Sequence, residues 1–267
     1  MNNKDILQIA MAQSAEDIGC KVEDFTKTEN VICTYNKGEK ARLYIKPGVI
    51  GNFVSYGSNV VASVQDDIRD ITEEYLKRFE FYHLFESPNM NWLSEKLSPL
   101  GYGVCFMAEY YLPDKDNFYD KGIVRPLVSE YELRVLEQKD FAELYLPEWG
   151  NALCEERKEL DVLGAGAYKD GKLVGLAGCS ADCDDMWQIG VDVLPECRRG
   201  GIASALTSKL ASEIFARGKV PFYCSAWSNI RSVRNAVKCG FIPAWVEMTI
   251  KPLSFINELN EEEKVQV

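Results

Sequence analysis

The sequence predicts an α+β fold in which a mixed, mostly antiparallel sheet is flanked by helices. Three observations support this prediction. Short strand-like segments alternate with segments whose apolar residues recur at helical spacing. The segment "KDGK" (169–172) carries an Asp-Gly pair between two such strands, which is typical of an antiparallel hairpin. With 46% hydrophobic and 27% charged residues, the 267-residue chain has the composition of a globular protein with a substantial core.

The first half is expected to form an N-terminal α+β domain over residues 1–115. A helix is predicted at 4–14, where Ile6, Ile9 and Ala10 share one face. The other predicted elements of this half are strands at 31–35, 41–46, 60–64 and 102–112 and helices at 66–79 and 89–100.

Residues 116–130 are polar and carry Pro and Gly, so they are expected to link this half to a second domain at 131–256. The tail 257–267 is acidic and is expected to be mobile. In the second half we expect a helix interrupted by Pro147 within 141–154. The remaining elements expected there are strands at 131–137, 162–168, 172–180, 186–193, 220–227 and 241–253 and helices at 201–218 and 229–240.

Charge and hydropathy exclude several classes of function. Thirty Lys and Arg against 41 Asp and Glu give a net charge of −11, which argues against nucleic acid or an anionic membrane as the main partner. No apolar run approaches the ~18 residues of a membrane span, and the first residues lack the core of a signal peptide. We therefore expect a cytoplasmic protein.

The nine cysteines are scattered and odd in number, so no disulfide framework is expected. The cluster "GCSADCDDM" places Cys179 and Cys183 beside three aspartates, but the only histidine, His83, is distant in sequence. A zinc site would require further soft ligands. We therefore expect a tight turn here and no bound metal.

The stretch "CRRGGIASAL" (197–206) places two arginines and two glycines directly before an amphipathic helix, an arrangement typical of an anion site. It lacks the Lys-hydroxyl pair of a Walker loop and the spacing of a dinucleotide fingerprint. Its pattern R-x-x-G-x-A instead predicts a pyrophosphate clamp built from consecutive main-chain N–H groups. The clamp residues are Arg198, Arg199, Gly200, Gly201, Ile202 and Ala203.

The segment "WQIGVDVLPECRRGGIASAL" resembles the signature strand, turn and helix of the GNAT family of N-acetyltransferases. The downstream "AWSNIRSVRNAVKCGF" resembles the second motif of that family, and the order of elements between Tyr131 and Lys251 fits as well. The whole chain is similar to bacterial two-part acetyltransferase-like proteins. The first half is then either a degenerate copy of the same fold or an unrelated α+β domain.

This resemblance implies acetyl-CoA as the cofactor and a slot between two separated strands for its pantetheine arm. The main chain of Val191 and Val193 would pair with that arm. Asn229 would cap the second helix and hydrogen-bond toward the coenzyme, with Ser232 on the same helix face.

One departure from the family pattern concerns the leaving thiolate. Many relatives carry a tyrosine that protonates it, but the corresponding position here is Ala236. Tyr223 is a substitute, although it and Cys224 point to opposite faces of one strand, so at most one of them is expected to face the slot. Asp192 is either a general base or a structural carboxylate that accepts main-chain hydrogen bonds. The resemblance also puts Glu148 on the acceptor side.

These residues predict an N-acyltransferase that moves an acetyl group from acetyl-CoA to a primary amine by direct attack in a ternary complex. The acceptor is expected to be a small molecule or a peptide. The alternative is a non-catalytic module that binds or senses acyl-CoA, which the loss of the usual tyrosine would favour. The sequence leaves the oligomeric state open, a homodimer included.

Overall fold

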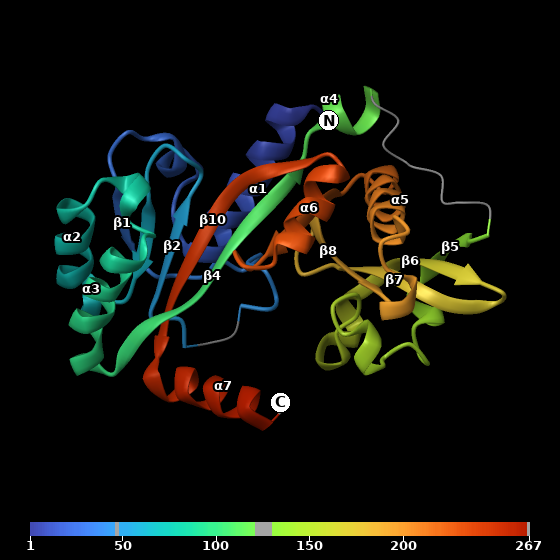
Figure 1. Cartoon of the computed structure of the whole chain (residues 1–267). Helices are drawn as coiled ribbons and strands as arrows, with labels where there is room; N and C mark the ends of the chain where they lie inside the picture. The colour runs from blue at the N-terminus through green and yellow to red at the C-terminus, as the bar shows by residue number, and fades with distance from the viewer. Residues whose placement is uncertain (46–47, 121–129, 266–267) are drawn as a thin grey trace. The chain divides into compact units, whose positions relative to one another are not determined.

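The computed structural model describes residues 1–45, 48–120 and 130–265 (Figure 1). The chain divides into two compact units. Unit 1 comprises Met1–Ile9 and Tyr110–Pro243, and unit 2 comprises Ala10–Glu109 and Ala244–Val267. The units and the predicted domains therefore divide the chain differently near both of its ends. Most of the predicted linker, residues 121–129, lies outside the described residues.

Unit 1 is a mixed sheet with helices packed on it. Its strand order is β4-β9-β8-β7-β6-β5. The pairs β5–β6, β6–β7 and β7–β8 are antiparallel, and β8–β9 is parallel. The elements are β4 (Tyr102–Pro113, shared with unit 2), α4 (Lys115–Asp120), β5 (Glu132–Glu137), β6 (Asp161–Lys169), β7 (Lys172–Ser180), β8 (Met186–Val193), α5 (Ile202–Ala216), β9 (Val220–Ser225) and α6 (Ile230–Lys238).

The hairpin and the long helix of unit 1 form as the sequence predicts. Asp170 and Gly171 turn between β6 and β7 with φ of 50° and 78°, the left-handed values that an Asp-Gly hairpin requires. Helix α5 connects the parallel strands β8 and β9 and packs on β6, β7 and β8. Its residues Ile202, Leu206, Leu210 and Ile214 are at most 1% exposed and form the centre of the core.

The predicted helix around Pro147 is wrong. The segment instead forms two 3-10 turns, η6 (Pro147–Trp149) and η7 (Glu155–Leu160). The reason is a close approach of backbone to backbone. A Cβ on Gly190 of β8 would lie 1.7 Å from the carbonyl oxygen of Asn151, and one on Gly178 of β7 would lie 2.1 Å from that of Ala152. Because Gly178 and Gly190 have no side chain, the irregular backbone at Asn151 and Ala152 can approach β7 and β8 closely.

Unit 2 has a second sheet region in the order β1-β3-β2-β10-β4. Strands β1 and β3 are parallel, whereas β2 runs antiparallel to β3 and β10. Its core contains Phe53, Ile68, Tyr75 and Met248, all fully buried. The elements are α1 (Asn3–Ile18, shared with unit 1), β1 (Val31–Thr34), β2 (Gly51–Ser55), β3 (Val61–Val64), α2 (Arg69–Arg78), α3 (Ser87–Leu97), β10 (Phe241–Pro252, shared with unit 1) and α7 (Leu253–Val265).

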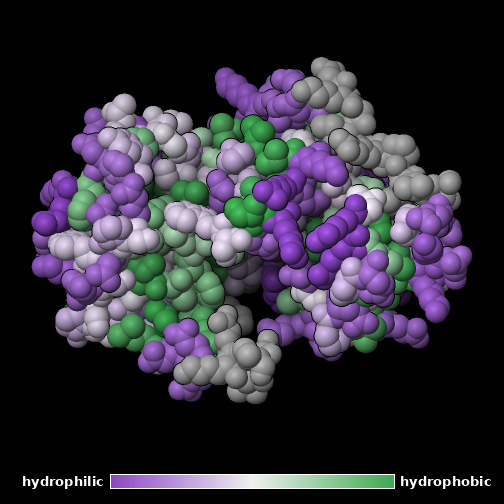
Figure 2. Space-filling model, in the orientation of Figure 1, coloured by the Kyte–Doolittle hydropathy of each residue, from purple (hydrophilic) through white to green (hydrophobic). Residues whose placement is uncertain are grey.

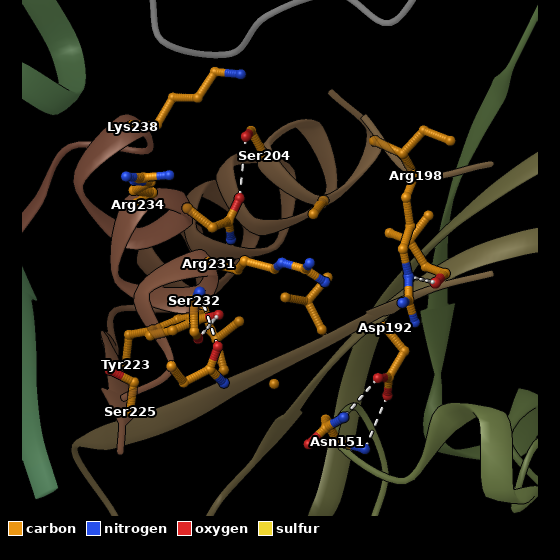
Figure 3. Close-up of a pocket in the computed structure, with 18 of the residues that line it drawn as sticks. Asn151, Asp192, Arg198, Ser204, Tyr223, Ser225, Arg231, Ser232, Arg234 and Lys238 are labelled. Carbon is orange, nitrogen blue, oxygen red and sulfur yellow. Dashed lines mark hydrogen bonds between the residues drawn. The ribbon is translucent and has the colours of Figure 1, made fainter. Parts of the chain in front are cut away.

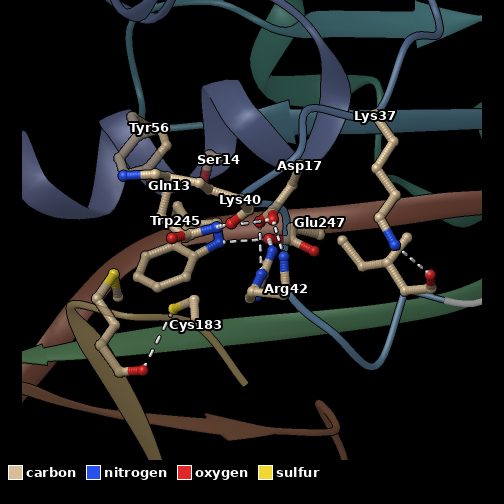
Figure 4. A network of polar contacts seen from close by, with 12 residues as sticks. Gln13, Ser14, Asp17, Lys37, Lys40, Arg42, Tyr56, Cys183, Trp245 and Glu247 are labelled. Carbon is tan, nitrogen blue, oxygen red and sulfur yellow. Dashed lines mark hydrogen bonds and ion pairs between the residues drawn. The ribbon is translucent and has the colours of Figure 1, made fainter. Parts of the chain in front are cut away.

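The strand predicted at 41–46 is absent from the described part of that segment, because Arg42 is drawn into the interior of unit 2 (Figure 4). The main-chain N–H of Arg42 donates to Asp17 of α1 at 2.7 Å, and its guanidinium pairs with Asp17 and with Glu247 of β10. Arg42 is 3% exposed. Burying a charge requires such partners, so this interaction fixes the local backbone.

Two further differences concern β2 and the C-terminal segment. Strand β2 was not predicted, and the segment expected to be a mobile tail continues as helix α7. The fold class itself is confirmed: the structure is a mixed α+β fold with a mostly antiparallel sheet flanked by helices. Among the described residues, no helix combines the length and apolar character needed to cross a bilayer.

Candidate functional site

Strands β8 and β9 pair over only part of their length. The parallel ladder joins Met186–Ile189 of β8 to Val220–Tyr223 of β9. Beyond it, β8 continues to Val193 with β7 as its partner, and β9 continues to Ser225. The two strands therefore separate after Ile189 and Tyr223, as the family resemblance implies.

The register shows which main-chain groups of β8 face this opening. The N–H of Leu194 donates to the carbonyl oxygen of Val174 on β7 at 3.0 Å. Because hydrogen bonding alternates along an antiparallel strand, Val191 and Val193 direct their N–H and C=O groups away from β7, toward the opening. The carbonyl of Val193 accepts from Arg198 Nε at 2.9 Å. Val191 therefore retains both a donor and an acceptor for an extended ligand.

The glycine-arginine turn holds a row of main-chain donors at the start of α5. Arg199 and Gly201 have φ of 70° and 84°. Such left-handed backbone bends the turn tightly, and glycine adopts it without steric cost. Among the described residues, no hydrogen-bond acceptor pairs with the main-chain N–H groups of residues 199–204. Unsatisfied donors at the positive end of a helix form an anion site.

The opening and the turn belong to one pocket with a volume of about 1120 Å³ (Figure 3). Five cations line it and Asp192 is its one carboxylate among the described residues, although the chain is acidic overall. The cations are Arg198, Arg199, Arg231, Arg234 and Lys238. Hydrophilic side chains also gather on the surface over α5 and α6 (Figure 2). The pocket thus presents an electropositive surface to an anionic ligand.

The predicted cofactor residues fall into two groups by position. All but one border the pocket, namely Val191, Val193, Arg198, Arg199, Gly201, Ile202, Ala203, Asn229 and Ser232. Gly200 is not among the pocket's lining residues, although it lies between two that are. Asn229 caps α6 by accepting from the N–H of Ser232 at 3.2 Å.

Tyr223 contacts both the pocket and α6. Its hydroxyl lies 2.9 Å from the Ser232 hydroxyl, and the residue is 4% exposed. Burial raises the pKa of Tyr223, so its phenol stays protonated at neutral pH. Ala236, one turn after Ser232, is fully buried in the core.

Cys224 borders the pocket together with Tyr223. The Cys224 sulfur accepts from Gln188 Nε2 of β8 at 3.1 Å.

The Asp192 carboxylate holds one wall of the pocket in place. It accepts from the main-chain N–H groups of Asn151 at 2.8 Å and Ala152 at 3.0 Å, and from Asn151 Nδ2 at 2.7 Å. These are the contacts expected of a structural carboxylate. Glu148, on η6 of the same segment, is exposed and is not among the residues that line the pocket.

Two buried carboxylates fix the other end of the 147–160 segment. Asp161 accepts from the N–H of Cys154 at 2.8 Å, and burial raises its pKa to about 6. Asp182, in the predicted cysteine-aspartate turn, pairs with Arg157 at 2.6 Å. In the same turn the Cys183 thiol donates to the carbonyl of Met186 at 3.2 Å. This turn therefore supports the wall of the pocket.

Several residues that border the pocket were not singled out from the sequence, among them Asn151 and three cations of α6. Asn151 is positioned through Asp192, so only the tertiary structure could reveal it. Arg231, Arg234 and Lys238 lie three and four residues apart after Asn229, which is the repeat of one helix face. That spacing was the available signal for a cationic stripe on α6.

Comparison with known proteins finds one family model that resembles part of this chain. Residues 130–241 match the model of the acetyltransferase (GNAT) family. No protein of curated function matches the sequence.

Among solved structures, a GCN5-related N-acetyltransferase-like protein from Streptococcus suis is 19% identical, with a TM-score of 0.47 over 61% of this chain and 69% of that one. A GNAT-family acetyltransferase from Colwellia psychrerythraea is 12% identical, with a TM-score of 0.43 over 94% and 97%. An aminoglycoside N-acetyltransferase in complex with CoA is 19% identical, with a TM-score of 0.35 over 45% and 93%. Residues 130–241, less than half of the chain, are thus similar to the GNAT family of acetyltransferases.

Proposed function

We propose that the pocket of unit 1 binds acetyl-CoA and that the chain transfers the acetyl group to a primary amine of a small molecule or peptide. The acceptor attacks directly while both substrates are bound. The observation that carries this proposal is the row of N–H groups at residues 199–204, which have no acceptor within the described part of the chain and lie at the same pocket as the edge of β8 beyond its pairing with β9. Acetyl-CoA supplies an activated acetyl thioester.

The residues present fit this cofactor from end to end. The N–H groups of residues 199–204 and the two arginines of the turn would hold the diphosphate. The main chain of Val191 and Val193 would hydrogen-bond the amides of the pantetheine arm, as in the addition of a strand to a sheet edge. The Asn229 and Ser232 side chains border the same path. These main-chain contacts orient the thioester carbonyl.

Tyr223 is the proposed proton donor to the leaving thiolate. Its hydroxyl reaches Ser232 on α6, the helix in which many relatives carry their tyrosine. The phenol carries its proton at neutral pH, and its place at the pocket is what supports the role of donor, since burial, which raises its pKa, makes it a weaker acid. Ser232 accepts or donates in the same hydrogen bond and thereby orients the phenol.

For Asp192 the hydrogen bonds from Asn151 and Ala152 favour a positioning role over that of a general base. The amine would then lose its proton to water. Glu148 is proposed to attract the acceptor, because its exposed carboxylate would draw a cationic amine.

Release of free CoA thiol tests this proposal. Purified protein is mixed with acetyl-CoA and a panel of primary amines, and a thiol reagent follows the product. We expect amine-dependent thiol release that follows the binding of acetyl-CoA. Failure to bind acetyl-CoA would overturn the proposal. Saturable binding without turnover on any amine would instead indicate a module that only binds acyl-CoA.

A further inference from the structure

The pocket of unit 1 contains two separate groups of cations. Arg198 and Arg199 belong to the turn before α5, whereas Arg234 and Lys238 lie on α6. In Figure 3 Arg231 extends from α6 toward the middle of the pocket, and Arg234 and Lys238 lie farther along the helix. Two cationic groups on two helices fit a ligand with two separate anionic centres.

Two features of the α6 cations are unfavourable for the helix itself, although Lys238 in the last turn suits the helix dipole. Arg234 and Lys238 are four residues apart, so two like charges face each other on neighbouring turns. Arg231 lies in the first turn, at the positive end of the helix dipole. Among the described residues, no carboxylate forms an ion pair with any of these three side chains. A bound anion would remove these costs.

We infer that Arg234 and Lys238 bind the 3′-phosphate on the ribose of coenzyme A and so make the protein selective for the 3′-phosphorylated nucleotide. This inference rests on the proposed function, because it needs the diphosphate held on residues 199–204 of α5 and its preceding turn. One ligand then spans the pocket, with its diphosphate on α5 and its second phosphate on α6. Arg231 lies between the two groups and can reach either.

Isothermal titration with CoA and with 3′-dephospho-CoA tests the inference. The wild-type protein is expected to bind CoA about tenfold more tightly, the sum of two exposed charge-assisted contacts. The double variant Arg234→Ala/Lys238→Ala is expected to bind the two ligands equally. Its matched control, Lys139→Ala/Lys172→Ala, removes two exposed cations that do not line the pocket. The control should retain the preference for CoA.

The outcomes separate this inference from the proposed function. Equal affinity of the wild-type protein for the two ligands would overturn the inference and leave the proposed function intact. A preference for CoA over 3′-dephospho-CoA that persists in Arg234→Ala/Lys238→Ala would also overturn the inference and leave the proposed function intact. If the wild-type protein binds neither ligand, the proposed function fails and the inference fails with it. Circular dichroism of each variant shows that α6 is still folded.

Discussion

Replacing Gly201 tests the phosphate-binding turn with an internal control. Gly201 has φ of 84°, and a Cβ added there would meet no atom within 4 Å. Asn and Asp both fit this space, have the same shape and tolerate left-handed backbone better than other residues. Gly201→Asn therefore reports the cost of the backbone and the added bulk. Gly201→Asp adds one negative charge to the same geometry.

The size of the charge effect follows from Coulomb's law. At about 5 Å from a doubly charged diphosphate, a carboxylate costs about 1.7 kcal/mol at the dielectric constant of water, and more in a less polar pocket. We therefore expect Gly201→Asp to bind CoA at least about 15-fold more weakly than Gly201→Asn at low ionic strength. Isothermal titration of both variants measures the ratio, and salt should reduce it. Equal affinities, or a ratio that 1 M NaCl does not change, would refute the assignment of the diphosphate to this turn.

Three further predictions concern the proton donor and the pocket wall. Tyr223→Phe should lower kcat roughly 100-fold with little change in the Kd for CoA; an unchanged kcat in stopped-flow thiol release would remove Tyr223 from the mechanism. Asp192→Asn should lower the free energy of unfolding by about 1–3 kcal/mol and leave the shape of the kcat pH profile unaltered. Loss of the acidic limb of that profile would restore Asp192 as the general base. Burial raises the pKa of Asp161 to about 6, so its contribution to stability is present below about pH 4 and is lost as the pH rises through 6. In urea unfolding, the free energy of unfolding of Asp161→Asn should rise relative to that of the wild type as the pH increases over this range. A difference between the two free energies that does not change with pH would contradict the raised pKa of Asp161.

Local sequence signals were sufficient for elements whose stability is mainly local. The Asp-Gly hairpin and the cap at Asn229 each depend on residues within four positions of one another. Local sequence signals failed where a residue distant in sequence determines the backbone conformation. Arg42 does not form the predicted strand, because its guanidinium pairs with Asp17 and Glu247. The segment after Pro147 does not form the predicted helix, because its backbone packs closely against glycines of other strands.

The same limit applies to the candidate site. The turn at residues 197–206 is contiguous, so its composition was enough to indicate an anion site. The hydroxyl contact between Tyr223 and Ser232 joins β9 to α6, and the convergence of the α6 cations with α5 requires both helices to be in place. Such contacts between elements have no signature in a single sequence.

The most direct test of the central claim is the response of the main-chain amide protons of residues 199–204 to CoA. Because these groups lack protein acceptors among the described residues, a bound diphosphate should become their partner. In ¹⁵N-labelled protein we expect downfield shifts and slowed hydrogen exchange at these amides on titration with CoA, with the same saturation as binding measured by calorimetry. Saturable binding of CoA that leaves these amides unchanged would contradict the account.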